Sequence, residues 1–450
     1  MRKRKTAVLS AIAAIAILLS ACGGSSPTDA PTTGDGTTKP VTTTTTGEAT
    51  DEPTNDETEP GTGETVKITL MQSKTEIQSD LETVVADFNN AGLGVEVTLL
   101  GTAGDNYATV LQSNFTADPA SAPTVFTLSG VDSVNFEQFY ATLDDTEAAK
   151  ILSEGLKPEF LNDAGELVGL PGSVEGYGFI YNVGMFEDAD IDPASLTDMD
   201  AFVAALETLA EVDGVVAPIG FAQETYFIFI HFFNWAIALD DNYVESIEAV
   251  NAAEMDLADM PSVQAWADAL ERIAAYTNKG QASYDEQVAG FGMGQYAMIH
   301  QGNWAQQVLE QNEVDFDYAF LPYPLEGNQG LAVGTASAWR VNNKATAEEQ
   351  AAAKTFIDWL ITSEEGQEHS ANTLNFIPAY QDVLAPVGGL SESVAEYVSD
   401  NQTVEWAFNS VFPAGIDIDG AAYMEEFYAG ILTADELIEE LSATWQDLAN

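Results

Sequence analysis

The segment Val66-Lys-Ile-Thr-Leu-Met71 opens a run of short apolar segments that alternate with amphipathic ones. The patterns predict, in order, a strand over 66–71, a helix over 76–89, a strand over 95–100, a helix over 107–116 and a strand over 124–128. This β-α-β-α-β succession favours a parallel sheet covered by helices on both faces. Ligands of such sheets bind at the carboxyl ends of strands, which makes Gln72, Ser73 and Asp132 candidate ligand contacts.

The remainder of the chain continues the α/β pattern without an internal repeat of fixed period. It predicts a strand over 296–300 and helices over 201–211, 262–277, 347–361 and 433–448. Thr197, with Asp200 three residues later, is the expected N-cap of the first of these helices. Roughly 385 residues follow the start of the first strand, more than one hydrophobic core comfortably holds, so we expect two lobes.

Charge is distributed unevenly in this sequence. The 450 residues include 72 acidic and 14 basic side chains, and four of the basic ones lie within the first five residues. A net charge of −58 repels phosphate backbones and anionic lipid headgroups, which excludes nucleic acid as a partner. The single cysteine cannot form an internal disulfide.

The first 22 residues have the features of a secretion signal. A basic start is followed by a thirteen-residue apolar run over 7–19, too short for a membrane span of about 20 residues. Leu19-Ser-Ala-Cys22 resembles the lipobox of bacterial lipoproteins, which predicts a signal peptide over 1–21 and a lipid anchor on Cys22. The alternative is an ordinary signal peptide in which the cysteine is incidental.

Residues 23–64 are rich in Thr, Pro, Gly and acidic side chains and contain almost no large apolar residue. Such a composition cannot bury enough apolar surface to order itself. We therefore expect 22–64 to be the lipidated cysteine and a disordered tether, about 35 Å long on average, between the outer face of a cell membrane and the folded region.

Four later segments, in this order, resemble the landmarks of family 1 extracellular solute-binding proteins, the maltose-binding-protein-like receptors of ABC sugar importers. They are Gly169-Leu-Pro-Gly-Ser-Val-Glu-Gly-Tyr-Gly-Phe-Ile-Tyr-Asn182, Gln223-Glu-Thr-Tyr-Phe227, Ala297-Met-Ile-His-Gln-Gly-Asn-Trp304 and Lys354-Thr-Phe-Ile-Asp-Trp-Leu-Ile-Thr-Ser-Glu-Glu-Gly366. The resemblance extends over nearly all of 66–450.

The resemblance implies a two-lobed type II periplasmic-binding-protein fold with a hinge and an interlobe cleft. Lobe 1 would comprise 65–175 and 338–385, and lobe 2 would comprise 176–337 and 386–450. Crossing strands near 179–182 and 336–341 would absorb a hinge rotation when a ligand closes the cleft. The resemblance further implies a monomer that delivers a carbohydrate to an ABC permease and is not an enzyme.

A sugar-binding site needs aromatic rings for stacking and planar polar groups for paired hydrogen bonds. Trp304 is the main aromatic candidate, because it follows an apolar strand and Gly302, which permits close approach. Asn303 beside it offers an amide. Glu175 lies in the first motif, at the place where the maltose-binding pattern has a Glu that contacts ligand hydroxyls.

Further candidates come from the motifs and their surroundings. Glu224 and Tyr226 belong to Glu-Thr-Tyr-Phe, which is close to the family's Glu-Pro-Tyr-Phe, while Tyr177 and Thr335 are expected to line the cleft. Any of these side chains could instead be structural, and in so acidic a chain most carboxylates are solvated surface. The maltose receptor's additional C-terminal Trp has no obvious counterpart, since Phe412 to Asp419 occupies that region.

Catalytic and metal-binding motifs are missing from the sequence. His231, His300 and His369 are isolated, and the acids of Asp188-Ala-Asp-Ile-Asp192 lack the Gly and Glu of a calcium loop. We therefore expect neither a metal nor a cofactor.

Three functions remain open from the sequence: an oligosaccharide receptor, which we favour, a receptor for a cationic solute such as a polyamine or quaternary amine, and a surface glycoside hydrolase. Aromatic rings beside carboxylates suit a cation as well as a sugar.

Overall fold

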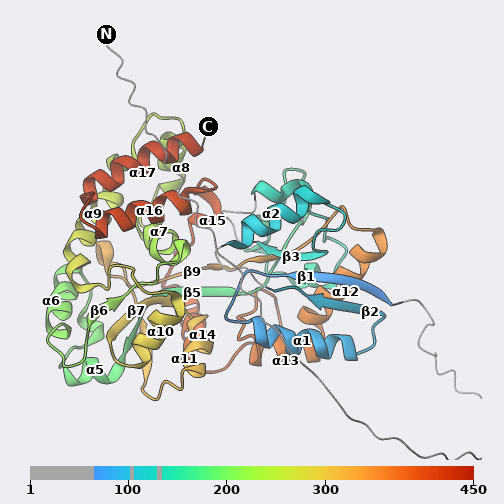
Figure 1. The fold of residues 1–450 in the computed structure, drawn as a ribbon, viewed down its shortest axis with the longest axis horizontal. Helices are drawn as coiled ribbons and strands as arrows, with labels where there is room; N and C mark the ends of the chain where they lie inside the picture. The colour runs from blue at the N-terminus through green and yellow to red at the C-terminus, as the bar shows by residue number, and fades with distance from the viewer. Residues whose placement is uncertain (1–64, 102–105, 129–133, 450) are drawn as a thin grey trace, which may run out of the picture. The chain divides into compact units, whose positions relative to one another are not determined.

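The computed structural model describes residues 65–101, 106–128 and 134–449, which form two β-sheets flanked by helices (Figure 1). The signal, Cys22, the tether and Asp132 lie outside these residues. Within the described ranges, no helix is both long and apolar enough to span a membrane.

The first sheet has the strand order β2-β1-β3-β10-β4. Its strands are β1 (Val66–Met71), β2 (Val95–Leu99), β3 (Val125–Leu128), β4 (Leu170–Pro171) and β10 (Ala338–Val341). The first three strands are parallel, as the sequence predicts, whereas β10 runs antiparallel between β3 and β4. A wholly parallel sheet was therefore a wrong expectation, because a strand from much later in the chain completes the sheet.

The second sheet has the order β11-β9-β5-β7-β6, and β8 also pairs with β5. Its strands are β5 (Val174–Asn182), β6 (Ala217–Gly220), β7 (Tyr296–Gly302), β8 (Tyr318–Leu321), β9 (Leu331–Thr335) and β11 (Thr403–Glu405). The central strand β5 pairs antiparallel with β7, β8 and β9 and is buried over nearly its whole length.

Helices that lie between the strands in sequence, or after the last strand, flank the sheets. In the first half these are α1 (Gln78–Asn90), α2 (Tyr107–Ala117), α4 (Glu147–Ile151), α5 (Val183–Asp188), α6 (Met199–Leu209), α7 (His231–Ala238), α8 (Tyr243–Asn251) and α9 (Pro261–Ile273). In the second half they are α10 (Tyr284–Gly292), α11 (Ala305–Gln311), α12 (Ala347–Thr362), α13 (Glu364–Asn372), α14 (Gly389–Ser399), α15 (Phe408–Val411), α16 (Ile416–Tyr428) and α17 (Ala434–Leu448).

Each sheet has its own hydrophobic core. On one face of the first sheet, α1 and α12 bury residues such as Phe88 and Phe356, and on the other face α2 buries Phe115. A separate core around the second sheet includes Trp235 and Trp266. The two sheets with separate cores confirm the two-lobed α/β fold.

Two short segments connect a strand of one sheet directly to a strand of the other. The first is Gly172–Ser173, between β4 and β5, and the second is Ala336–Ser337, between β9 and β10. They lie side by side, because the Gly172 N–H donates to the Ser337 carbonyl at 3.1 Å and the Ala336 N–H donates to the Ser173 carbonyl at 2.9 Å. The expected crossing at 179–182 was placed too far along the chain, since these residues lie within β5.

Helix starts follow local side-chain chemistry. Helix α12 begins at a capping box, in which the Thr346 hydroxyl accepts from the Glu349 N–H and the Glu349 carboxylate accepts from the Thr346 N–H. Asp198, not the expected Thr197, caps α6: its carboxylate accepts from the N–H groups of Asp200 and Ala201. An ionised carboxylate satisfies both orphan donors at once.

Candidate functional site

A cavity of about 540 Å³ lies beside the two crossing segments and is lined from both sheets. Its lining includes Ser73, Lys74, Glu76, Tyr107, Glu175, Glu224, Tyr226, Phe227, His231, Tyr284, Trp304, Ala336, Ser337, Trp406, Phe408 and Asp417. Half of the lining residues carry aromatic rings or carboxylates, and Lys74 is the only Lys or Arg among the described residues that line the cleft. The size is within the usual range of small-molecule sites.

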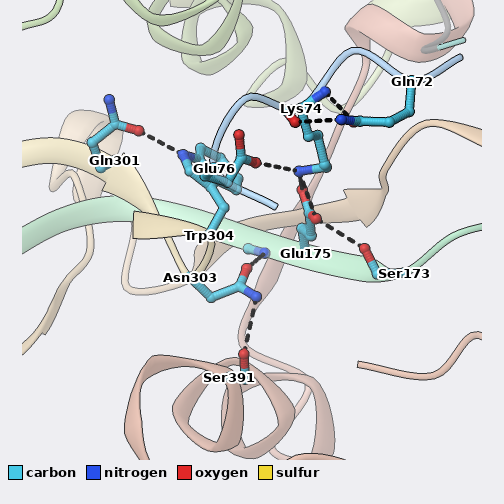
Figure 2. Close-up of polar contacts among 10 residues, drawn as sticks. Gln72, Lys74, Glu76, Ser173, Glu175, Gln301, Asn303, Trp304 and Ser391 are labelled. Carbon is cyan, nitrogen blue, oxygen red and sulfur yellow. Dashed lines mark hydrogen bonds and ion pairs between the residues drawn. The ribbon is translucent and has the colours of Figure 1, made fainter. Parts of the chain in front are cut away.

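Lys74 bridges the two sheets at the edge of the cleft. It follows β1, and its ammonium contacts Glu175 Oε1 and Oε2 at 2.9 and 3.1 Å and Glu76 Oε1 at 3.2 Å (Figure 2). Glu175, on β5, also accepts from the Ser173 hydroxyl at 2.9 Å. The structure thus brings Glu175 to the cleft wall, where it is held by a lysine that sequence reasoning overlooked.

The charge state of Lys74 follows from these contacts. Burial by itself would lower the pKa of Lys74, but the carboxylates of Glu175 and Glu76 together raise that pKa above its ordinary value. The side chain is 18% exposed, so the ammonium is largely removed from water while remaining protonated. The three side chains form a partly buried ionic cluster with a net charge of −1.

Trp304 forms the aromatic wall next to this cluster. It follows β7 and precedes α11, and its Nε1 donates to Gln301 Oε1 at 2.7 Å (Figure 2). A Cβ atom at residue 302 would lie 2.3 Å from the indole ring, so only glycine allows the ring to fold back there. Phe227 stacks at 6.1 Å between ring centroids, and the Lys74 ammonium lies 5.6 Å from the Trp304 ring.

A second aromatic wall comes from the C-terminal region. Trp406 and Phe408 follow β11, stack at 5.1 Å and both line the cleft. The Trp406 indole packs over Gly334, where a Cβ would lie 2.5 Å from the ring. The sequence offered no obvious counterpart of the maltose receptor's C-terminal Trp, and it did not reveal that Trp406 lines the cleft. Trp406 lies several residues before 412–419, directly after a strand too short to stand out in the sequence.

The Nε1 donor of Trp406 is buried and finds no acceptor in the described part of the chain. The hydroxyl of Tyr284, also in the cleft lining, is likewise buried without a partner among the described residues. Burial, reinforced by the charges of Glu76, Asp285, Glu175 and Glu224, raises the pKa of Tyr284 well above its ordinary value, so this hydroxyl keeps its proton. Buried donors of this kind are costly unless a ligand supplies acceptors.

Glu224 and Tyr226 line the same cleft, as their motif suggested. Tyr226 begins a single π-helical turn, Tyr226–Ile230, that leads into α7, and Glu224 lies two residues before this turn. Glu224 Oε1 accepts from the Tyr284 N–H at 2.9 Å, which ties the turn to the start of α10. Nearby, Thr225 donates to Asp417, and burial raises the pKa of that aspartate.

The other predicted residues occupy different places. Ser73 lines the cleft. Gln72 is buried behind it and bonds the backbone of Lys74, and Asn303 is buried between the Gly176 N–H and the Ser391 hydroxyl. Thr335 donates to Glu159 at 2.6 Å, outside the cleft lining.

Tyr177 was wrongly expected to line the cleft. It is fully buried behind the aromatic walls, and its hydroxyl donates to the His231 carbonyl at 2.9 Å. The Tyr177 side chain belongs to the hydrophobic core around the second sheet, where it packs against Trp235 and His300.

Two histidines lie in and behind the cleft. His231 lines it, packed against Tyr177, Trp304 and Trp406, and His300 lies deeper, with Trp235 Nε1 at 3.5 Å. Burial lowers the pKa of His231 well below its usual value, with smaller contributions from His300 and Lys74, and burial lowers the pKa of His300 to about 3. Both rings are therefore neutral at physiological pH. Among the described residues, no group of three or more His, Cys, Asp or Glu is arranged to hold a metal ion.

Comparison with known proteins identifies the family. The sequence profile of the bacterial extracellular solute-binding proteins matches residues 83–399, which is more than half of the chain. The chain belongs to this family. The resemblance seen in the sequence motifs is thereby confirmed.

Solved structures of other solute-binding proteins are similar to this one. A Bacillus licheniformis sugar transporter protein in complex with stachyose is 18% identical, with a TM-score of 0.69, and the match covers 85% of this chain and all of the other. A chitin oligosaccharide binding protein is 21% identical, with a TM-score of 0.70, and the match covers 86% of this chain and all of the other. RafE in complex with raffinose is 18% identical, with a TM-score of 0.71, and the match covers 86% of this chain and all of the other. At these identities the likeness shows the fold.

A curated relative is the xylose/arabinose-binding protein XacG of Haloferax volcanii, 27% identical over 289 residues. The match covers 60% of this chain and 57% of the relative, so this solute-binding protein spans a little over half of that relative's length.

The two histidines make stability depend on pH. Their folded-state pKa values lie below the unfolded value of about 6.5, so the unfolded chain binds protons that the folded chain cannot, and stability falls as pH drops below 6.5. Each histidine contributes a slope approaching about 1.4 kcal/mol per pH unit. We predict that His300→Gln reduces the slope of unfolding free energy against pH between 6.5 and 5 by up to this amount, measured by urea denaturation. An unchanged slope would contradict the prediction.

Trp304 should contribute to ligand affinity through its place in the wall. We predict that Trp304→Ala weakens ligand binding by roughly tenfold or more, measured by tryptophan fluorescence or calorimetry. Trp359→Ala is the matched control, because Trp359 is likewise 8% exposed but packs on Phe88 in the other core. The control should lose stability and retain affinity; equal affinity losses in both variants would refute a direct role for Trp304.

Proposed function

We infer that this protein captures a carbohydrate, an oligosaccharide rather than a monosaccharide, outside the cytoplasm and delivers it to an ABC permease. The family supports a binding role. The size of the cleft, its aromatic walls and its carboxylates support a ligand that has both apolar faces and hydroxyl groups.

The observation that carries this proposal is the pair of buried donors at Trp406 and Tyr284, which find no acceptor among the described residues. An indole N–H can only donate. A sugar hydroxyl has lone pairs to accept that hydrogen bond and a proton to give to a carboxylate such as Glu175 or Glu224. One sugar hydroxyl can therefore pair with a cleft donor such as Trp406 Nε1 and with a cleft carboxylate.

A cationic solute fits this cleft less well. A polyamine or quaternary amine that is fully protonated or alkylated has no lone pair to accept from Trp406 Nε1. The position beside Trp304 and Glu175 that would suit a cation is already taken by the Lys74 ammonium. Stachyose, raffinose and chitin oligosaccharide in the names of similar proteins also point to sugars.

Ligand binding would close the cleft between the two lobes. Lobe 1 comprises 65–175 and 338–385, and lobe 2 comprises 176–337 and 386–450. The crossing segments at 172–173 and 336–337 are short and linked by two backbone hydrogen bonds, which supports a hinge there. We further propose that the protein acts as a monomer, without enzymatic activity, and that a lipid on Cys22 anchors it to the outer face of the membrane through the tether. These last proposals rest on the sequence.

The direct test is a ligand panel of mono- and oligosaccharides, polyamines and betaines, read by thermal shift and tryptophan fluorescence. We expect a neutral oligosaccharide to raise the melting temperature and to bind stoichiometrically without turnover. Affinity should be nearly independent of salt, because no net charge is transferred. Stabilisation by cations alone would favour the cationic alternative, and released products in chromatography would indicate a glycoside hydrolase.

Trp406→Phe tests the buried donor. The variant retains an aromatic ring over Gly334 but loses the N–H. We predict a threefold to tenfold weaker affinity for the oligosaccharide, about one hydrogen bond, together with unchanged or higher stability of the free protein. Trp445→Phe is the control, because Trp445 Nε1 donates to Asn251 at 3.0 Å. That variant should lose stability and keep affinity; the same pattern for Trp406→Phe would rule out the donor's role.

A further inference from the structure

The surroundings of the Lys74 ammonium have the composition of a cation-binding cage. Carboxylates of Glu175 and Glu76 supply oxygens at 2.9, 3.1 and 3.2 Å, and the Trp304 ring lies 5.6 Å away (Figure 2). An ammonium has three donors, and there are three such contacts. Carboxylates and an indole around one charge are the groups that recognise an alkylammonium ligand.

Hydrogen bonds from Gln72 hold the Lys74 backbone in place after β1, and this positions the ammonium in the cage. Gln72 is buried, and its side chain bonds both backbone groups of Lys74: its Oε1 accepts from the Lys74 N–H, and its Nε2 donates to the Lys74 carbonyl at 2.7 Å. The same Nε2 donates to Gln78 Oε1 at 2.9 Å, at the start of α1. Gln72 is therefore a positioning residue for Lys74 and has no surface in the large cleft.

We propose that Glu76, Glu175 and Trp304 form an alkylammonium site that the chain fills with its own Lys74, and that this filling makes the cleft select neutral solutes over cationic ones. The selectivity part rests on the proposed sugar-binding function. Lys74 completes the site in the way that a ligand would, by neutralising carboxylates that are buried beside the aromatic wall.

Removing the Lys74 side chain should leave the alkylammonium site empty. Glu175 is 5% exposed, and Lys74 is the only Lys or Arg among the described residues that line the cleft. A buried carboxylate that loses its partner is strongly destabilising. The emptied space matches the lost atoms, which are three methylenes and an ammonium. n-Propylammonium has this same structure, so it should bind the emptied site.

The experiment is chemical rescue of Lys74→Ala. We expect the variant to be less stable than the wild type, to bind the oligosaccharide at least tenfold more weakly and to regain both properties in millimolar n-propylammonium chloride. Neither 1-propanol, which has the shape without the charge, nor tetramethylammonium, which has the charge without N–H donors, should rescue it. Adding Glu175→Gln should abolish the rescue. The wild-type protein should not respond to n-propylammonium.

Lys74→Met provides a second test that does not depend on an emptied site. The methionine fills the stem space without charge, so this variant should bind the sugar weakly and ignore n-propylammonium. Wild-type sugar affinity in Lys74→Met, or equal responses of the wild type and Lys74→Ala to n-propylammonium, would overturn the inference. So would the absence of any response in a folded Lys74→Ala.

The two proposals can fail separately. Thermal stabilisation of Lys74→Ala by n-propylammonium needs no sugar, so it tests the cage even if no carbohydrate in the panel binds. A carbohydrate that binds the wild type, together with a Lys74→Ala variant that n-propylammonium does not affect, would leave the sugar function standing and refute the cage.

Discussion

The backbone pairing of the two crossing segments is the constraint on which the site depends. Two hydrogen bonds join Gly172 to Ser337 and Ser173 to Ala336, at the point where the chain passes between sheets. Glu175 lies two residues beyond one segment, and Ala336 and Ser337 themselves line the cleft. The site therefore lies beside the two segments that connect a strand of one sheet directly to a strand of the other, and short connections of this kind can act as hinges.

The chemistry of the cleft follows from how its polar groups are paired. One ionic cluster, formed by Lys74, Glu76 and Glu175, is satisfied within the protein, whereas the donors of Trp406 and Tyr284 have no acceptor in the described chain. The ionic cluster holds its charges in fixed positions in the cleft wall. The donors of Trp406 and Tyr284 need a hydrogen-bond acceptor that only a ligand or solvent can supply. A cleft of this kind distinguishes solutes by their lone pairs as much as by their charge.

Much of the fold was predictable, because its signals are local. Apolar alternation marked β1 and β2, and the amphipathic spacing marked α12 within a residue of its observed ends. The antiparallel place of β10 was not predictable, since a strand of four residues carries no information on its partners. In the site, motif context located Trp304, Glu175, Glu224 and Tyr226, but the contact of Lys74 with Glu175 joins residues 101 positions apart. No periodicity reports such a contact, and the same holds for Trp406.

The position of β10 has a consequence for how the chain is made. The strand comes from residues 338–341 but lies between β3 and β4, so the first sheet cannot be completed until three quarters of the polypeptide exists. Pairing across such sequence distances is slow, because the long loop must close before its contacts are gained. A nascent chain that cannot finish its first sheet remains unfolded for longer. Such a delay would favour an export route that threads an extended polypeptide through a narrow pore.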